Sequence, residues 1–436
     1  MQASDNKQSI SDPEKAGTPT DSRSGVTPTP PPEPPKPAPF PEGGLQGWST
    51  LAGAYTNGFG VYQDYYVRRY LTNYTPSEIG WIGGTQIFLI FSMGILTGRA
   101  FDRGYLLNPP LVVVLIMFFF QSVFMLSLSH QNAYYQVFLA QGICLGASCG
   151  LCYIPSLTIV SHYFQRRRPF AMGIVAAGSA LGAVIHPIML NRFFNGSLGF
   201  HNGVRVSAAI NTFLLIIANF MMRTRLPARK TGKAIPIVEF ARDPPYVFVV
   251  IAGILLFGGL FFPVFYLQTN AIQHGVDATF AFYSLPILNA ASVVGRTLPS
   301  LFAPRFGVFN LIIFFTVGAG ITILCMTAVK DVAGTACFAV FFGFCSGATI
   351  SLVPPVLGIL SKDMSEIGAR IGIDFFFCGM PSGVVNFATP IAGALLTSEF
   401  IWLHAILFAG IMMIASGGSF AIARIFVAKR RGTQIT

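Results

Sequence analysis

Long apolar segments alternate with short polar ones along most of the chain. From Gly43 onward the apolar runs are each about 20 residues long, the length that a helix needs to cross a hydrocarbon core about 30 Å thick. The pattern therefore predicts an all-α membrane protein. Twelve membrane-spanning helices are expected, near residues 45–67, 80–101, 109–129, 134–160, 170–192, 203–223, 246–268, 279–301, 307–329, 333–360, 370–396 and 400–424.

Polar segments divide these spans into two groups. Residues 1–41 are rich in Pro, Ser and Thr and have no apolar stripe to bury, which predicts a disordered cytosolic tail. The basic segment 224–245 has six predicted spans on either side. We therefore expect an N-terminal six-helix half at 42–223, a cytosolic linker at 224–245, a C-terminal six-helix half at 246–424 and a cytosolic tail at 425–436. Two pseudo-symmetric halves around a central site are typical of secondary transporters.

The first predicted span is short. The apolar run from Gly47 to Tyr62 is only sixteen residues long, after which Gln63 and Asp64 interrupt it. At 1.5 Å per residue this covers about 24 Å of a core about 30 Å thick. Either Gln63 and Asp64 are drawn into the membrane, or the span is defective, or the gene model omits part of it. We hypothesise that part of the span has been lost.

Charge supports a membrane setting and an orientation. Only 10% of residues are charged, against about 25% in soluble domains. The net charge is +11, but the basic residues lie in short loops after even-numbered spans, such as the one that holds Arg166, Arg167 and Arg168. A nucleic-acid partner would need a basic groove, so the expected partner is a lipid bilayer. By the positive-inside rule both termini should be cytosolic, and the plasma membrane is the expected location.

Small residues recur through the fifth predicted span. Gly173, Ala177, Gly178 and Gly182 lie at helical spacing, and close helix packing in lipid depends on such residues. A contact within the chain is the favoured interpretation; a dimerising helix is the alternative. The C-x-x-C pair Cys149 and Cys152 lies in an apolar span and is read as packing, since redox and metal sites need an accessible, electropositive setting.

Several motifs carry a family resemblance. The stretch GILTGRAFDRGY at 94–105 resembles the loop motif between the second and third spans of the major facilitator superfamily. YFQRRRPFAMGIVAAGSALG (163–182), PEGGLQGW (41–48) and FGVYQDYYV (59–67) resemble the fungal branch of its monocarboxylate-porter family. The resemblance implies secondary transport of small organic solutes. In the best-known members these are monocarboxylates carried with a proton, and the fungal branch also includes riboflavin carriers and metabolite exporters.

The same resemblance suggests a substrate site. Arg296 lies within the eighth span and matches an arginine that binds the anionic substrate in monocarboxylate porters. The family's aspartate four residues earlier is Ser292 here, and its first-span lysine has no counterpart, so protons are only a possible coupling ion. The alternative is that Arg296 snorkels to the interface and shapes the gate. Other polar residues inside spans could bind a ligand or join helices: Asn289, Gln86, Gln141 and Asn386. His186 is similarly either a proton relay or structural.

A cytosolic gate is also implied. Asp102 and Arg103 match the family's loop motif, and Arg305 lies in its weaker echo between the eighth and ninth spans. Asp374 follows Arg370 by one helical turn, where i,i+4 pairing suits an acid, and it is a candidate to complete the latch with Arg103. The alternative for these residues is a solvated turn that only fixes topology.

The predicted function is secondary transport of a small anionic organic solute by alternating access. The chain has no G-x-x-x-x-G-K-S/T loop for ATP, and no catalytic triad or metal-ligand cluster stands out, so neither an enzyme nor a cofactor is expected. The alternatives are a non-transporting nutrient sensor, an exporter of a secondary metabolite, a riboflavin-type carrier and a channel.

Overall fold

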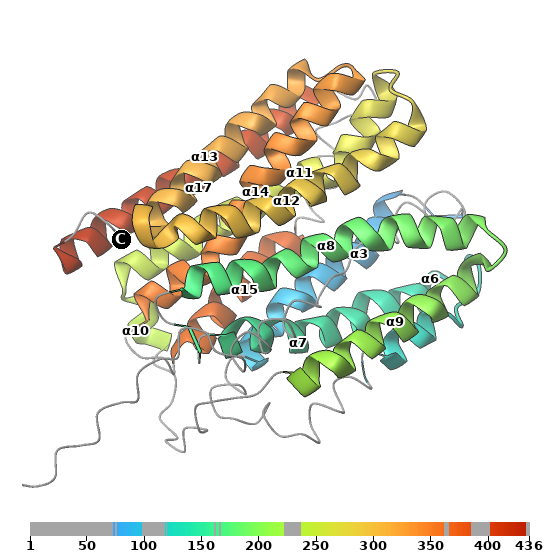
Figure 1. The fold of residues 1–436 in the computed structure, drawn as a ribbon, viewed down its shortest axis with the longest axis horizontal. Helices are drawn as coiled ribbons and strands as arrows, with labels where there is room; N and C mark the ends of the chain where they lie inside the picture. Colours follow the sequence, from blue (N-terminus) through green and yellow to red (C-terminus); the bar gives the residue numbers. More distant parts are fainter. Residues whose placement is uncertain are drawn as a thin grey trace, which may run out of the picture. The chain divides into compact units, whose positions relative to one another are not determined.

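The computed structural model describes residues 73–74, 76–97, 118, 120–160, 163–164, 167–221, 237–361, 366–384 and 402–432. All of them belong to one compact unit that begins at Phe40. Within these ranges every regular element is a helix, which confirms the all-α prediction (Figure 1). The first predicted span, residues 98–117 and Asn386 lie outside the described residues, so the short first span, Asp102 and Arg103 do too.

The helices of the first half coincide with the predicted spans. They are α3 (Pro76–Ser92), the run of α6 (Tyr134–Val137), the π-helix η3 (Phe138–Leu145) and α7 (Gly146–Ile159), then α8 (Arg168–Asn195) and α9 (Gly199–Met221). The π-helix is a feature that the apolar pattern did not predict. It lies in the first half of the fourth predicted span and holds Gln141.

A short helix, α10 (Ile237–Ala241), lies inside the predicted linker before the second half. The long helices that follow are α11 (Pro244–Gln273), α12 (Ala278–Phe306), α13 (Val308–Cys325), α14 (Val332–Leu360), α15 (Ile367–Val384) and α17 (Trp402–Arg431), with a 3-10 turn η5 (Met326–Ala328) after α13. The last helix continues to Arg431, beyond the predicted end of its span at 424. In the described part of the chain eight helices are long and apolar enough to cross a membrane, and Trp81–Thr97 is a shorter apolar helix.

Local sequence explains where several helices begin. The Asp277 carboxylate accepts hydrogen bonds from the backbone N–H groups of Thr279 and Phe280 at 3.0 and 3.3 Å, and so caps α12. Asp331 caps α14 in the same way, by accepting from the Gly334 N–H at 2.8 Å. Gly307, at a φ of 83°, makes the turn from α12 to α13, where a residue with a Cβ would be strained.

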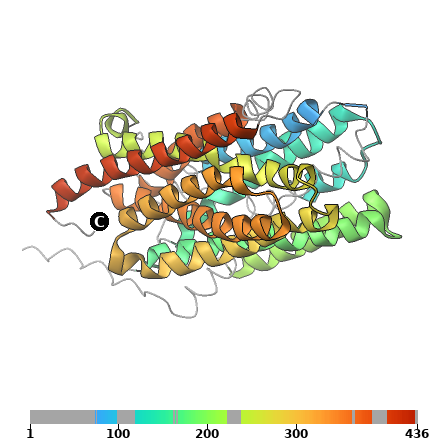
Figure 2. The same ribbon diagram turned by 90° about the horizontal axis from the view of Figure 1, so that it is seen from above.

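Two helix pairs make the most extensive contacts between the first half and the second. α8 packs along α12 and also contacts α14, while α3 packs along α15. Both views show the long helices lying side by side along a common direction (Figures 1 and 2). If the second half repeats the first, the second span corresponds to the eighth and the fifth to the eleventh. The two contacts are then equivalent, as a pseudo-two-fold axis between six-helix halves requires.

Glycines permit the closest of these approaches. A Cβ on Gly173 of α8 would lie 2.8 Å from the Ser300 hydroxyl of α12, and closer still to the backbone carbonyl of Arg296. This confirms that Gly173 serves a contact within the chain. Within the second half, a Cβ on Gly347 of α14 would lie 2.6 Å from the Ser292 carbonyl oxygen of α12. Since lipid gives helices no hydrophobic drive to associate, such backbone-to-backbone packing holds the bundle together.

Candidate functional site

Arg296 lies where α12 crosses α8. Its guanidinium donates hydrogen bonds to the backbone carbonyl of Ala176 at 2.6 Å and to the Ser179 hydroxyl, both on α8. Its Nε donates to the Ser292 hydroxyl, one turn earlier on α12, at 3.2 Å. The arginine therefore connects the two halves of the protein, and it lies beside the close contact at Gly173.

Neutral oxygens of the protein accept hydrogen bonds from Arg296, but no described carboxylate neutralises its charge. Its three hydrogen-bond acceptors are one carbonyl and two hydroxyl oxygens, and no carboxylate pairs with it in the described part of the chain. A charged side chain at membrane depth is costly, and such residues usually face a cavity or a partner. The Arg296 side chain is half-buried in the structure.

An aromatic cluster from both halves lies close to this arginine. The Tyr153 hydroxyl of α7 is within electrostatic reach of Arg296. The Tyr153 ring packs against Phe91 of α3 and Phe375 of α15, with ring centroids 6.3 and 5.8 Å apart. Phe91 in turn contacts Phe257 of α11 at 4.9 Å. Four helices thus contribute rings to one cluster, and offset or edge-on stacking on such rings suits a planar apolar group.

The other predicted substrate residues do not converge on Arg296 through any described contact. Asn289, on α12, donates to the Leu285 carbonyl of its own helix at 3.0 Å. Gln86 and Gln141 are buried and contact each other: the Gln141 amide donates to the Gln86 side-chain oxygen at 3.4 Å. This bond joins α3 to the π-helix, and irregular π-turns often mark functional positions.

His186 occupies a half-buried position on α8. Its Nδ1 lies 3.3 Å from the Gly182 carbonyl of its own helix. Its Nε2 is buried and has no hydrogen-bond partner among the described residues. The imidazole also interacts with the Asn211 side chain of α9. Neither neighbour connects His186 to Arg296 or to the aromatic cluster.

Of the four predicted gate residues, two are described. Arg305 is exposed in the last turn of α12, with its guanidinium 5.9 Å from the Phe306 ring centre. Asp374 is fully buried, and its carboxylate accepts a hydrogen bond from the Cys378 thiol at 3.8 Å. The expected i,i+4 pairing of Asp374 with Arg370 is wrong. Arg370 turns instead toward Asp243 at 3.3 Å and Glu366 at 3.6 Å, because these carboxylates lie closer to the helix end and to water.

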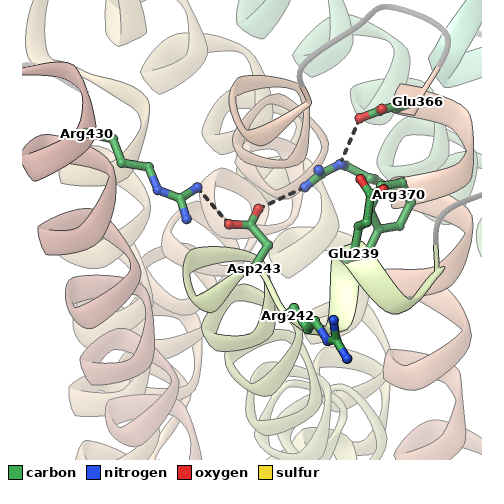
Figure 3. Close-up of a pocket in the computed structure, with 7 residues that line it drawn as sticks. Glu239, Arg242, Asp243, Glu366, Arg370 and Arg430 are labelled. Atoms are coloured by element: carbon green, nitrogen blue, oxygen red, sulfur yellow. Dashed lines mark hydrogen bonds and ion pairs between the residues drawn. The ribbon is translucent and has the colours of Figure 1, made fainter.

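Arg370 belongs to a clamp that the sequence analysis missed (Figure 3). We define this clamp by Phe240, Asp243, Tyr246, Glu366, Arg370 and Arg430. Asp243 accepts from both arginines, with Arg430 at 2.7 Å. The Arg370 guanidinium also lies 4.3 Å from the Phe240 ring centre and 5.2 Å from that of Tyr246. A cavity of about 430 Å³ opens beside it, lined by the charged members of the clamp together with Phe240, Glu239 and Arg242.

The clamp ties three separate chain segments together. Asp243 precedes α11, Arg370 and Glu366 lie at the start of α15, and Arg430 lies at the end of α17. In Figure 3 the Arg242 side chain points away from Asp243. The sequence signal was weak: an acid before the two prolines that open α11 suggests a helix start, but nothing local pairs it with Arg370 or Arg430.

Comparisons with known proteins agree with this architecture. The sequence profile of the Major Facilitator Superfamily matches residues 47–386. The chain is 36% identical over 393 residues to the aspyridones efflux protein of Emericella nidulans, covering 87% of this chain and 77% of that protein. It is 36% identical over 376 residues to the agnestins efflux protein of Paecilomyces divaricatus, covering 85% and 83%.

A further relative and a solved structure extend the comparison. An MFS-type transporter of an Ophiocordyceps species is 35% identical over 374 residues, covering 83% of this chain and 81% of that protein. The fold resembles that of the E. coli fucose:proton symporter FucP, with a TM-score of 0.64 at 15% identity over 87% of this chain and 97% of that one. The long apolar helices, the paired cross-half contacts and the profile match agree. The chain is a multi-pass membrane transporter that belongs to the Major Facilitator Superfamily.

Proposed function

We propose that this transporter exports a small, planar organic anion of the secondary-metabolite kind across the plasma membrane, with both termini in the cytosol. The substrate would bind between α8 and α12, with its charge at Arg296 and its flat apolar body against the cluster of Tyr153, Phe91, Phe375 and Phe257. Alternating access would then carry it across as the halves rock about this contact.

The observation that supports the proposal most is the setting of Arg296. It is a cation at the contact between the halves, and in the described part of the chain it is hydrogen-bonded only to neutral oxygens. A guanidinium forms strong, paired hydrogen bonds with a carboxylate. The resemblance to the fungal branch of the monocarboxylate porters is compatible with this, since their substrates include carboxylates.

The direction of transport is supported by relatives. Two fungal proteins that are 36% identical to this chain are named as efflux proteins, for aspyridones and for agnestins. The cluster of four rings favours a planar substrate over a short aliphatic acid such as lactate, since a small aliphatic chain would leave most of the aromatic surface uncovered.

The proposal is tested by comparing a charged substrate with its uncharged analogue. Proteoliposomes containing the full chain are loaded with a pool of fungal aromatic carboxylic acids or with their methyl esters, and efflux of each is measured. We expect saturable efflux of at least one acid. Arg296→Gln should slow it about tenfold or more, a loss of about 1.4 kcal/mol, while Arg296→Lys retains part of the rate.

The esters separate recognition from structural damage. A variant that has lost only its anion contact transports the ester as well as the wild type does, whereas a misfolded variant transports neither. Arg192→Gln, which changes an exposed arginine near the far end of α8, is the matched control and should leave both rates unchanged. Equal efflux of acid by wild type and Arg296→Gln would refute the assignment of Arg296. Absence of flux for every acid would refute the substrate class and favour a sensor.

A further inference from the structure

Asp374 is a buried carboxyl group with no cationic partner among the described residues. Its side chain is fully inaccessible to solvent. Its Oδ2 accepts a hydrogen bond from the Cys378 thiol at 3.8 Å, and no described residue donates to its Oδ1. The nearest cation along its own helix, Arg370, is engaged by Asp243 and Glu366. A thiol is a weak donor, so it compensates a negative charge poorly.

The described parts of the helices packed against α15 supply no cation either. On α11 the titratable neighbour is Tyr246, whose hydroxyl donates to the Arg370 backbone carbonyl at 3.0 Å. Among the described residues, the titratable groups of the other packing helices are Glu78 near the opposite end of α3, Cys149, Cys152 and Tyr153 on α7, and Cys337 and Cys345 on α14. None of these groups is basic.

The site is shaped to hold this carboxyl group. Gly253 of α11 faces it: a Cβ there would lie 3.5 Å from Oδ1 and would collide with the Cys378 sulfur. The glycine therefore makes the room that the Asp374 and Cys378 side chains occupy between α11 and α15. Because α11 lies so close to α15, water is excluded from the Asp374 carboxyl group. No described residue forms an ion pair with it in exchange.

An ionised carboxylate in such a place would cost several kcal/mol, whereas the protonated acid costs far less. We propose that Asp374 is a proton-binding site: it carries a proton in this conformation and releases it when water reaches the group. On release the O–H bond of the carboxyl breaks and the proton passes to water, leaving the carboxylate. The ligand is thus a proton, and the reaction needs no other partner than water.

The clamp separates this site from the solvent. Arg370 lies one turn before Asp374 on α15, and the cavity beside the clamp is lined by Arg370, Glu366 and Asp243. The Phe240 and Tyr246 ring centres lie 4.3 and 5.2 Å from the Arg370 guanidinium. Opening the clamp would admit water from this cavity, with the carboxylates of Glu366 and Asp243 at its mouth to exchange protons. Proton coupling at Asp374 rests on the proposed transport function, but proton binding there does not.

Infrared spectroscopy of the full chain in lipid tests proton binding directly. We expect the C=O stretching band of a protonated carboxyl at a pH where exposed aspartates are ionised, and its isotope shift in protein labelled with carbonyl-¹³C aspartate. Asp374→Asn should abolish the band, while Asp331→Asn, which changes an exposed capping aspartate, should leave it. If Asp374→Asn does not fold, Cys378→Ala still tests the assignment: it keeps the carboxyl, removes its hydrogen-bond donor and should shift the band.

Two outcomes would overturn the proposal. One is that wild-type protein lacks the band; the other is that the band survives Asp374→Asn or is unmoved by Cys378→Ala. The proposed path of proton exchange, through the cavity beside the clamp, is tested by Asp243→Asn. This variant weakens the clamp, so the infrared band should disappear at lower pH than in wild type. An unchanged titration of the band would refute this path.

Coupling of proton movement to substrate transport is measured in a separate experiment. With a substrate identified, a pH-sensitive dye inside proteoliposomes should report proton movement with wild-type transport. Asp374→Asn should abolish this movement while substrate exchange continues; undiminished proton movement in the variant would refute coupling at Asp374. If no organic anion is transported yet the infrared band behaves as described, the proposed function fails and the proton site stands.

Discussion

Gly173 of α8 lies directly against Arg296 of α12, with the glycine at the backbone carbonyl of the arginine. The side chain of the same arginine reaches back across the contact to the Ala176 carbonyl, one turn further along α8. One turn of each helix therefore contains both a close backbone contact and the half-buried cation where α8 meets α12. Packing and charge at this point should respond separately to mutation.

The first prediction concerns packing at Gly173. An alanine there places a Cβ against backbone and against Ser300, neither of which can move without shifting α12. We expect Gly173→Ala to destabilise the protein by about 1–3 kcal/mol, measured by thermal unfolding in detergent. Gly418→Ala is the matched control, because no atom lies within 4 Å of a Cβ built at this helical glycine. It should be neutral or stabilise by up to about 1 kcal/mol; equal losses in both variants would contradict the packing argument.

The second prediction concerns the clamp. Asp243→Asn leaves the buried Arg370 with only Glu366 as a carboxylate partner and should cost about 3 kcal/mol of unfolding free energy. Arg430→Gln removes the other partner of Asp243, but that arginine side chain is 55% exposed, so the loss should be below about 1 kcal/mol. Chemical unfolding of the two variants measures the difference. If the Arg430 variant were the less stable one, burial would not be what gives the clamp its strength.

The third prediction concerns the amide pair of Gln86 and Gln141. If their hydrogen bond joins α3 to the π-helix, a double-mutant cycle with leucine at each position should give a coupling energy of about 0.6–1.7 kcal/mol. Unfolding measurements on the two single variants and the double variant supply the cycle. A coupling near zero, together with impaired transport in either single variant, would favour the alternative that the amides bind a ligand.

The fourth prediction concerns pH and the start of α12. Hydrogen bonds from Thr279 and from the backbone N–H of Phe280 hold the pKa of Asp277 below its ordinary value of 3.8. Because the folded pKa is depressed, the carboxylate stabilises the fold above the unfolded value, and this contribution is lost as the pH falls through the folded pKa. Asp277→Ala should therefore melt below wild type near neutrality, with the gap narrowing on acidification. Asp277→Asn retains a cap without titrating, so its melting temperature should lack this pH dependence; a constant gap for the alanine variant would contradict the assignment.

The substrate residues show the limits of local information. Arg296 stands out in the sequence because a charge inside an apolar span is conspicuous, and the structure places it at the contact between the halves. Asn289 was expected either to bind a ligand or to join helices, yet its amide donates to a carbonyl of its own helix. A polar residue in lipid has this local option whatever its neighbours are, so a sequence pattern cannot decide which option is used.

The sequence by itself determined the helices and their approximate ends, because bilayer thickness and the need to satisfy backbone hydrogen bonds leave few other choices for runs of about 20 apolar residues. It also determined that Gly173 would make a close contact. Only the tertiary structure decided what that contact is, that Arg370 turns to Asp243 and Arg430, and that Asp374 is left buried with a thiol. Helix formation depends on residues a few positions apart, whereas these partners come from distant helices. In lipid, which side chains become partners depends on how well they fit together rather than on their hydrophobicity.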